Sequence, residues 1–241
     1  MSLRLHYAPD NASLCIRLAL LELGVPFDTV PVDRAAQGQK SPAYLALNPN
    51  GLIPVLETPD GPLFETGAIL LWLADTHGGP HGKLLPGPSD PGRGAALKWL
   101  FWLANTLHAT ERMLFYPGQY TSGGAAMKQA LLAQTKSRLT GQFSILAVAV
   151  DAGWLDDDEP SALACYLAPL LRWPVIYGGG PDWPALSNWP RLLRFAQRFE
   201  RRTAALTAMQ AEGLGLTPFS APQSLNPLGV GPTDPKPSHS S

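Results

Sequence analysis

The sequence has few cysteines and no excess of charge of either sign. Its two cysteines, Cys15 and Cys165, lie too far apart along the chain for the paired spacing of metal and redox motifs. Lysine and arginine together number 18 against 19 aspartates and glutamates, so the formal net charge is −1. This balance argues against nucleic acid or an anionic membrane as a major partner. We therefore expect no metal, no nucleic-acid partner and a reducing, cytoplasmic location.

Long hydrophobic runs are also missing. No uninterrupted apolar stretch is long enough to span a bilayer. Near the N-terminus, Leu3, Leu5 and Tyr7 alternate with polar residues, whereas a signal peptide has a continuous apolar segment. The composition, 45% hydrophobic and 15% charged, is typical of soluble globular proteins, and 241 residues suffice for two small domains with cores. We expect no association with a membrane.

The first third of the chain has the pattern of a βαβ unit followed by two strands and a helix. The helix after the first strand is expected to end at Gly24, a residue that suits the left-handed position after a helix. The predicted elements are strand 3–7, helix 13–23, strand 27–32, short helix 42–47, a hairpin over 55–57 and 63–64, and helix 66–75. This order predicts an α/β thioredoxin-like domain over residues 1–79.

Beyond a segment rich in glycine and proline at residues 77–90, almost the whole pattern is helical. The predicted helices cover residues 95–116, 125–150, 161–173, 189–199 and 203–211. We expect an all-α domain over residues 90–216. Prolines, serines and glycines dominate the remainder, so residues 217–241 are expected to form an extended tail.

A proline in an apolar run is the most informative local feature. Pro54 cannot lie in an ordinary central strand because it has no N–H for the sheet. Ile53-Pro54 is therefore a candidate cis peptide bond, which would leave the backbone of Ile53 free to pair with an extended, peptide-like ligand. Glu65-Thr66 follows where a strand gives way to a helix, and a helix N-terminus favours a ligand carboxylate. Together these motifs predict a pocket for a small peptide with a charged end.

A thioredoxin-like half with these motifs, joined to an all-helical half, resembles the cytosolic glutathione transferase family over roughly residues 3–219. The motifs are Lys40-Ser41-Pro42-Ala43-Tyr44-Leu45-Ala46-Leu47-Asn48-Pro49, Ile53-Pro54 and Glu65-Thr66, with Leu107-His108, Leu114-Phe115-Tyr116-Pro117 and Trp189-Pro190-Arg191-Leu192 most like the bacterial beta class. One motif departs from that class. Beta-class proteins carry a cysteine just before a serine at the start of the first helix, where this chain has Ala12-Ser13. Mixed-disulfide chemistry by that residue is excluded, and we expect Cys15 to be a core residue.

The resemblance implies a homodimeric transferase that conjugates reduced glutathione to hydrophobic electrophiles by stabilising the glutathione thiolate, without a metal. Two other functions remain open. One is a glutathione-dependent disulfide reductase or peroxidase, and the other is a non-catalytic glutathione-binding or protein-interaction module, because this fold serves both purposes.

The resemblance also implies site residues. Ser13, Asn11 and Tyr7 are alternative donors to the glutathione thiolate, although Ser13 could instead cap the helix and Tyr7 could pack in the core. The glutathione-binding residues would be Lys40 near the glycyl carboxylate, Ile53 and Pro54 along the backbone, and Glu65 and Thr66 at the γ-glutamyl end. The co-substrate pocket would be lined by Asn105, His108, Arg112 and Tyr116.

Overall fold

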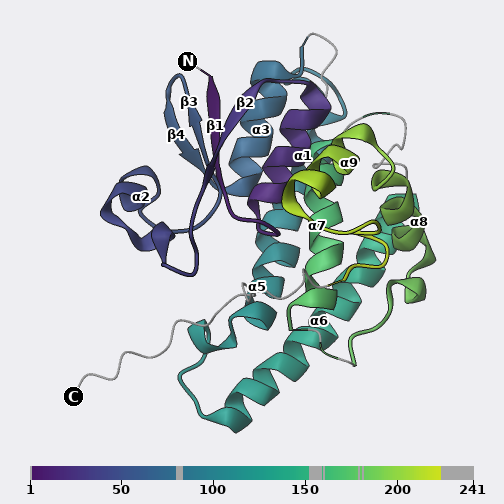
Figure 1. The fold of residues 1–241 in the computed structure, drawn as a ribbon. Helices are drawn as coiled ribbons and strands as arrows, with labels where there is room; N and C mark the ends of the chain where they lie inside the picture. The colour runs from purple at the N-terminus through teal and green to yellow at the C-terminus, as the bar shows by residue number, and fades with distance from the viewer. Residues whose placement is uncertain are drawn as a thin grey trace.

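The computed structural model describes residues 2–79, 84–151, 159, 161–178, 180 and 182–223. The chain forms an α/β part that contains the N-terminal sheet, and a larger helical part packed beside it (Figure 1). The α/β part ends with α3, and the described residues from α4 onward contain helices but no named strand. We keep 1–79 and 90–216 as proposed domain bounds. Residues 224–241 of the expected tail lie outside the described residues.

A four-stranded sheet with the order β2-β1-β3-β4 forms the centre of the α/β part. β1 pairs parallel with β2 and antiparallel with β3, and β3 pairs antiparallel with β4. The strands and helices of this part are β1 (Leu3–Tyr7), α1 (Ser13–Leu23), β2 (Phe27–Pro31), η1 (Gly38–Lys40), α2 (Pro42–Leu47), β3 (Val55–Thr58), β4 (Gly61–Phe64) and α3 (Thr66–His77). In Figure 1, α1 and α3 lie between the sheet and the helical part, whereas α2 lies on the far side. The predicted thioredoxin-like order is confirmed.

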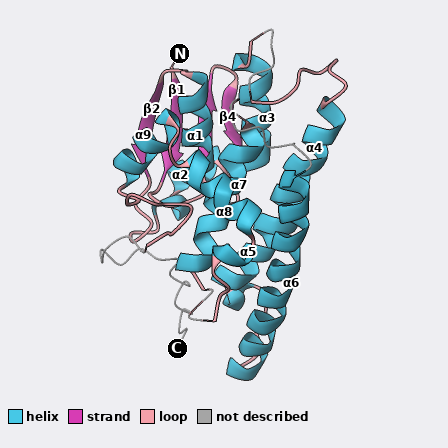
Figure 2. Cartoon of the chain, turned by 90° about the vertical axis from the view of Figure 1, so that its right-hand side faces the viewer, coloured by secondary structure: helices cyan, strands magenta, loops and turns pink. Residues whose placement is uncertain are grey.

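The helical part contains α4 (Arg93–Trp102), η2 (Leu103–His108), α5 (Ala109–Phe115), η3 (Pro117–Gln119), α6 (Ala125–Asp151), α7 (Ala162–Ile176), η4 (Leu186–Asn188), α8 (Pro190–Phe199) and α9 (Thr203–Glu212). Figure 2 shows α4, α5 and α6 running along one side of the molecule. The single helix predicted over 95–116 is in fact two α-helices joined by the π-helical turn η2. Such turns are frequent at functional sites because they rotate the side chains that follow.

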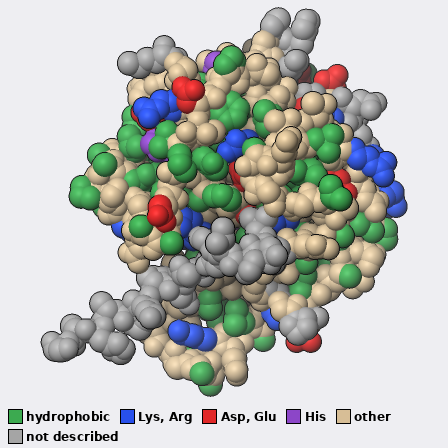
Figure 3. Space-filling view, viewed as in Figure 1, with side chains coloured by type: hydrophobic (Ala, Val, Ile, Leu, Met, Phe, Trp, Pro, Cys, Tyr) green, Lys and Arg blue, Asp and Glu red, His purple; other side chains and the backbone are tan. Residues whose placement is uncertain are grey.

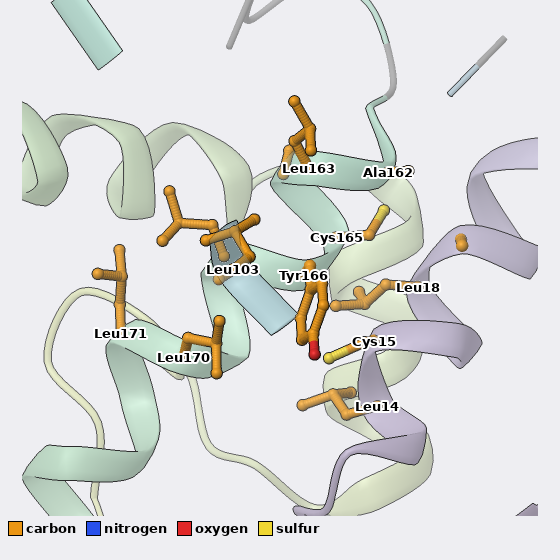
Figure 4. Packing of buried hydrophobic residues seen from close by; sticks show 14 of the residues in the cluster. Leu14, Cys15, Leu18, Leu103, Ala162, Leu163, Cys165, Tyr166, Leu170 and Leu171 are labelled. Atoms are coloured by element: carbon orange, nitrogen blue, oxygen red, sulfur yellow. The ribbon is translucent and has the colours of Figure 1, made fainter. Parts of the chain in front are cut away.

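Helix α7 is the centre of the core. Its residues from Ala162 to Pro174 are all buried, and it packs against α1 of the other part. Figure 4 shows Tyr166 of α7 pointing towards Cys15 of α1, with leucines on either side. Cys15 and Cys165 are free and fully buried, and burial raises the pKa of both thiols. The prediction that Cys15 is a core residue is confirmed.

A buried ion pair joins α7 to the loop between β1 and α1. The carboxylate of Asp10 accepts from Nε and Nη2 of Arg172 at 2.8 and 2.9 Å, from the Trp173 indole and from the Tyr177 hydroxyl. Both charged side chains are 0% exposed. The backbone N–H of Asp10 also donates to Glu212 of α9. The loop that precedes α1 is therefore held by residues from α7 and α9.

The same arginine reaches the C-terminal segment. Nη1 of Arg172 donates to the carbonyl of Pro218, and Nη2 donates to that of Gln223. Glu200 accepts from the backbone N–H groups of Phe219 and Ser220. The segment after α9 is thus tied back onto α7 and α8.

Within the described residues, no helix is long and apolar enough to cross a membrane.

One buried carboxyl group has no partner in the described part of the chain. Glu111 of α5 is 0% exposed, and neither of its oxygens makes a hydrogen bond there. Burial raises its pKa well above the ordinary glutamate value. The folded protein therefore holds Glu111 as the neutral acid at pH values where the unfolded chain would release the proton.

The buried ion pair gives a prediction about stability. Asp10→Asn leaves the Arg172 guanidinium buried without a counter-charge, and breaking such a pair costs about 3–5 kcal/mol. We expect urea denaturation to show a loss of unfolding free energy of that size. The control Asp60→Asn, in an exposed turn, should change it by no more than about 0.5 kcal/mol. A loss below about 1 kcal/mol in Asp10→Asn would contradict the assigned role.

Glu111 gives a prediction about pH. Its pKa is raised on folding, so its contribution to stability is largest at acidic pH and falls as pH rises above the ordinary glutamate pKa. Glu111→Gln removes this titration. At pH 8 we expect the variant to melt a few degrees above the wild type, by about 2–4 °C for each kcal/mol gained in unfolding free energy. At pH 5 the difference in melting temperature should be smaller. Calorimetry that found the same difference at both pH values would refute the assignment.

Candidate functional site

The Ile53-Pro54 peptide bond is cis, as the sequence predicts. The preceding loop is fixed, because Tyr44 Oη and Asn48 Nδ2 both donate to the carbonyl of Leu52, at 2.9 and 2.8 Å. Among the described residues, the backbone of Ile53 has no hydrogen-bond partner. Its N–H and C=O are therefore available to an extended ligand at the start of β3.

Lys40 lies over the same loop. Its Nζ donates to the carbonyl of Asn50 at 3.1 Å, and the residue is exposed. Gly51 adopts φ +60°, and a Cβ there would lie 2.8 Å from Lys40 Nζ and 2.8 Å from the carbonyl oxygen of Gln39. Only glycine allows this close approach. The turn therefore places the ammonium group next to the loop that carries the cis peptide bond.

Glu65 and Thr66 lie at the start of α3. Glu65 has φ 74° and ψ 114°, a conformation that residues other than glycine rarely adopt. Its side chain makes no capping hydrogen bond to α3. The Glu65 carboxylate is exposed, whereas Thr66 is the buried first residue of the helix. This combination of an exposed carboxylate and a helix N-terminus suits a ligand that has both an ammonium and a carboxylate group.

At the start of α1, the predicted donors differ in accessibility. Ser13 is fully buried, and its hydroxyl both donates to the carbonyl of Ala8 and accepts from the N–H of Ala8. Asn11 is half-buried, and its Oδ1 accepts from the N–H of Ala12 at 2.9 Å. This bond directs the oxygen towards the helix and leaves the amide Nδ2 as a donor for a ligand.

Tyr7 has a different neighbour. The Arg17 guanidinium lies over its ring, 4.5 Å from the centroid, and Arg17 itself pairs with Glu212 of α9. The ring is half-buried and packs against the core. These contacts match the alternative in which Tyr7 is a packing residue.

His108, the last residue of η2, contacts two aromatic residues of α7. Its Nδ1 is 2.9 Å from the hydroxyl of Tyr166, and its ring packs against Trp173. Burial, with a smaller contribution from the nearby Arg112 charge, lowers the pKa of His108 to about 4. The imidazole is therefore neutral at pH 7. The pKa of Tyr166 is raised mainly by burial, whereas the nearby Thr66 hydroxyl favours the phenolate.

The other predicted pocket residues come together only in part. The Arg112 guanidinium lies 5.5 Å from the centre of the Tyr116 ring. The hydroxyl of Tyr116 accepts from Arg34 Nη2 at 3.2 Å, so the loop after β2 reaches the end of α5. Asn105 is exposed, and no contact in the described part of the chain joins it to this group.

Sequence reasoning missed Asp10, Arg34, Arg172 and Tyr177. A signal was present for two of them. Arg172 is the only charged residue in α7, where a buried guanidinium requires a counter-charge. Asp10 directly precedes the candidate donor Asn11. Arg34 gave no signal, because a single charged residue in a loop is ordinarily solvated.

The assembled geometry suits recognition and positioning of a ligand more than covalent chemistry by the protein. The candidate site offers the free backbone of Ile53, the N-terminus of α3 and the exposed Glu65 carboxylate. The amide of Asn11 adds a hydrogen-bond donor at the start of α1. The described residues include no group of three or more His, Cys, Asp or Glu side chains that could hold a metal ion. Neither cysteine is accessible.

Comparisons with known proteins agree with this geometry. Residues 1–75 match the family described as glutathione S-transferase, N-terminal domain. The fold resembles a sphingomonad glutathione S-transferase complexed with glutathione, with a TM-score of 0.71 and 29% identity over 88% of this chain and 100% of that one. It also resembles the bacterial beta class enzyme of Sphingomonas chungbukensis, with a TM-score of 0.69 and 27% identity over 87% of this chain and 98% of that one.

A curated relative matches the chain in sequence over its whole length. The chain is 30% identical over 217 residues to glutathione S-transferase GST-4.5 of Xanthomonas campestris pv. campestris, and the alignment covers 88% of this chain and 100% of that protein. Sequence and fold therefore agree over both the α/β and the helical part: the chain belongs to the glutathione S-transferase family.

Proposed function

We propose that this protein conjugates reduced glutathione to hydrophobic electrophiles by binding the glutathione thiolate at the start of α1. The observation that carries the proposal is the cis Ile53-Pro54 bond, where the Ile53 backbone has no partner among the described residues, together with the unusual backbone of Glu65. The Ile53 backbone would pair with the cysteinyl unit of glutathione. Glu65 would hold the α-ammonium, Thr66 would hold the γ-glutamyl carboxylate, and Lys40 would attract the glycyl carboxylate.

Of the three candidate thiol donors, the contacts favour Asn11. Its Nδ2 has no partner in the described part of the chain, whereas the Ser13 hydroxyl is already used by Ala8. The dipole at the N-terminus of α1 would add to the stabilisation of a thiolate. The thiolate would attack the electrophilic carbon, the leaving group would depart with its bonding electrons, and the thiol proton would pass to solvent.

A glutathione-dependent disulfide reductase that uses a protein thiol has less support. Burial raises the pKa of Cys15 and of Cys165, and the thiolate, not the thiol, is the nucleophile. Any redox reaction would have to rely on glutathione thiols alone. A glutathione-binding module without catalysis would use the same residues, and the measurement of thiol pKa below separates it from a transferase.

We also propose that the protein is a homodimer. Several large apolar side chains of α4 and α6 are exposed, namely Phe101, Ile145 and Val148. Exposed apolar side chains on neighbouring helices are suited to an interface between copies. The two-fold partner would place its α/β part against the helical part of the first chain, as the family resemblance implies.

The glutathione site can be tested by calorimetry. We expect Glu65→Ala and Thr66→Ala each to weaken glutathione binding by about 1–3 kcal/mol, because each leaves a charged group of the ligand without its partner. Thr207→Ala, which removes an exposed threonine of α9, is the matched control and should bind like the wild type. Unchanged affinity in both site variants would overturn the pocket.

The identity of the thiol donor can be tested by ultraviolet titration of the bound thiolate. Asn11→Ala should raise the pKa of the bound thiol by about one unit, equivalent to about 1.4 kcal/mol. The same titration of Cys15→Ala should match the wild type because that thiol is buried. If Ser13→Ala shifted the curve and Asn11→Ala did not, the buried serine would be the donor. A wild-type thiol pKa equal to that of free glutathione would favour the non-catalytic module.

A further inference from the structure

Two arginines from different parts of the molecule converge on one tyrosine. Arg34, in the loop after β2, donates from Nη2 to the hydroxyl of Tyr116 at 3.2 Å. Arg112 of α5 lies with its guanidinium 5.5 Å from the centre of the same ring. All three residues are half-buried. The Tyr116 side chain therefore brings two positive charges close together where the α/β and helical parts meet.

Neither guanidinium is paired with a carboxylate among the described residues. Five other arginines of the described chain do have such a partner: Arg4, Arg17, Arg93, Arg172 and Arg202. The acidic residues next in sequence form no ion pair with either arginine. The Asp33 carboxylate instead accepts from the N–H of Ala36, and burial raises the pKa of Glu111, which favours its neutral form. His108 is neutral, so the positive charge beside Tyr116 comes from the two arginines.

An aromatic wall leads from this pair to the start of α1. The Phe115 ring lies 6.5 Å from that of Tyr116 and 6.2 Å from that of Tyr177, both in edge-to-face geometry. Tyr177 in turn donates to Asp10, the residue immediately before Asn11. A co-substrate lying along these rings would thus have the arginines at one end and the proposed thiolate position at the other.

We propose that the co-substrate of this enzyme is an aromatic or similarly flat electrophile with a carboxylate, which Arg34 and Arg112 bind while the rings of Phe115, Tyr116 and Tyr177 contact its apolar part. This inference rests on the proposed function. Unpaired guanidinium groups in a half-buried position suit a carboxylate because their planar forks match its two oxygens. The described part of the face in Figure 3 shows basic and acidic side chains interspersed, without a broad basic patch. Selection for an anion therefore depends on this local pair.

A matched pair of electrophiles tests the proposal. 4-Chloro-3-nitrobenzoate and 4-chloro-3-nitrobenzamide have the same ring and leaving group and differ in the charge of one substituent. We expect kcat/KM for the benzoate, relative to the amide, to fall about tenfold in Arg34→Gln and in Arg112→Gln. Because both electrophiles react with the same bound glutathione, the ratio of their kcat/KM values cancels any effect of a variant on glutathione binding or activation. Arg138→Gln, at an exposed position of α6, is the control and should keep the wild-type ratio.

Binding of the finished conjugates separates this inference from the proposed function. Calorimetry with the two glutathione conjugates, one with a carboxylate and one with an amide, compares the same groups without turnover. Tighter binding of the carboxylate, lost in both arginine variants, supports the anion site even if the protein turns over neither electrophile. Absence of turnover of both electrophiles would instead count against the proposed transferase activity. Equal wild-type binding of the two conjugates, or a preference that both arginine variants retain, would overturn the anion site.

Discussion

The buried ion pair between Asp10 and Arg172 is the interaction on which the arrangement of the site depends. Asp10 belongs to the loop that leads into α1, and Arg172 lies in the most buried helix of the other part. Two charges removed from water are tolerated only when they meet each other and further hydrogen-bond partners, and here the indole of Trp173 and the hydroxyl of Tyr177 supply them. The position of the first turn of α1 is therefore set by a helix distant in sequence.

Helix α7 connects more than this loop. Its Tyr166 bonds His108 at the π-helical turn and lies close to Thr66 at the start of α3. Arg172 also bonds the segment after α9. The two proposed halves of the site, one for glutathione and one for its co-substrate, are thus supported by one helix. This arrangement is possible because α7 is apolar along nearly its whole length and carries its few polar groups at positions where each finds a partner.

The absence of an accessible thiol determines what chemistry the site can support. Ala12 precedes Ser13 at the start of α1, and the two cysteines of the sequence, Cys15 and Cys165, are enclosed in the core. What remains near the start of α1 is an amide side chain and the positive end of a helix. Such groups stabilise charge and orient a bound thiol, and they do not form covalent bonds with it. The reactivity would therefore come from glutathione.

The sequence by itself determined the order of strands and helices, the cis bond at Pro54, and the location of Glu65 and Thr66 where a strand gives way to a helix. These features follow from local rules: hydrophobic periodicity, the missing N–H of proline, and the chemistry of a helix start. Only the tertiary structure decided which polar residues meet. It enclosed Ser13, left the amide of Asn11 available, paired Asp10 with Arg172, and brought Arg34 to Tyr116. Partners 82 and 162 residues apart leave no local pattern, because their contact depends on how α7 and α5 pack against the α/β part.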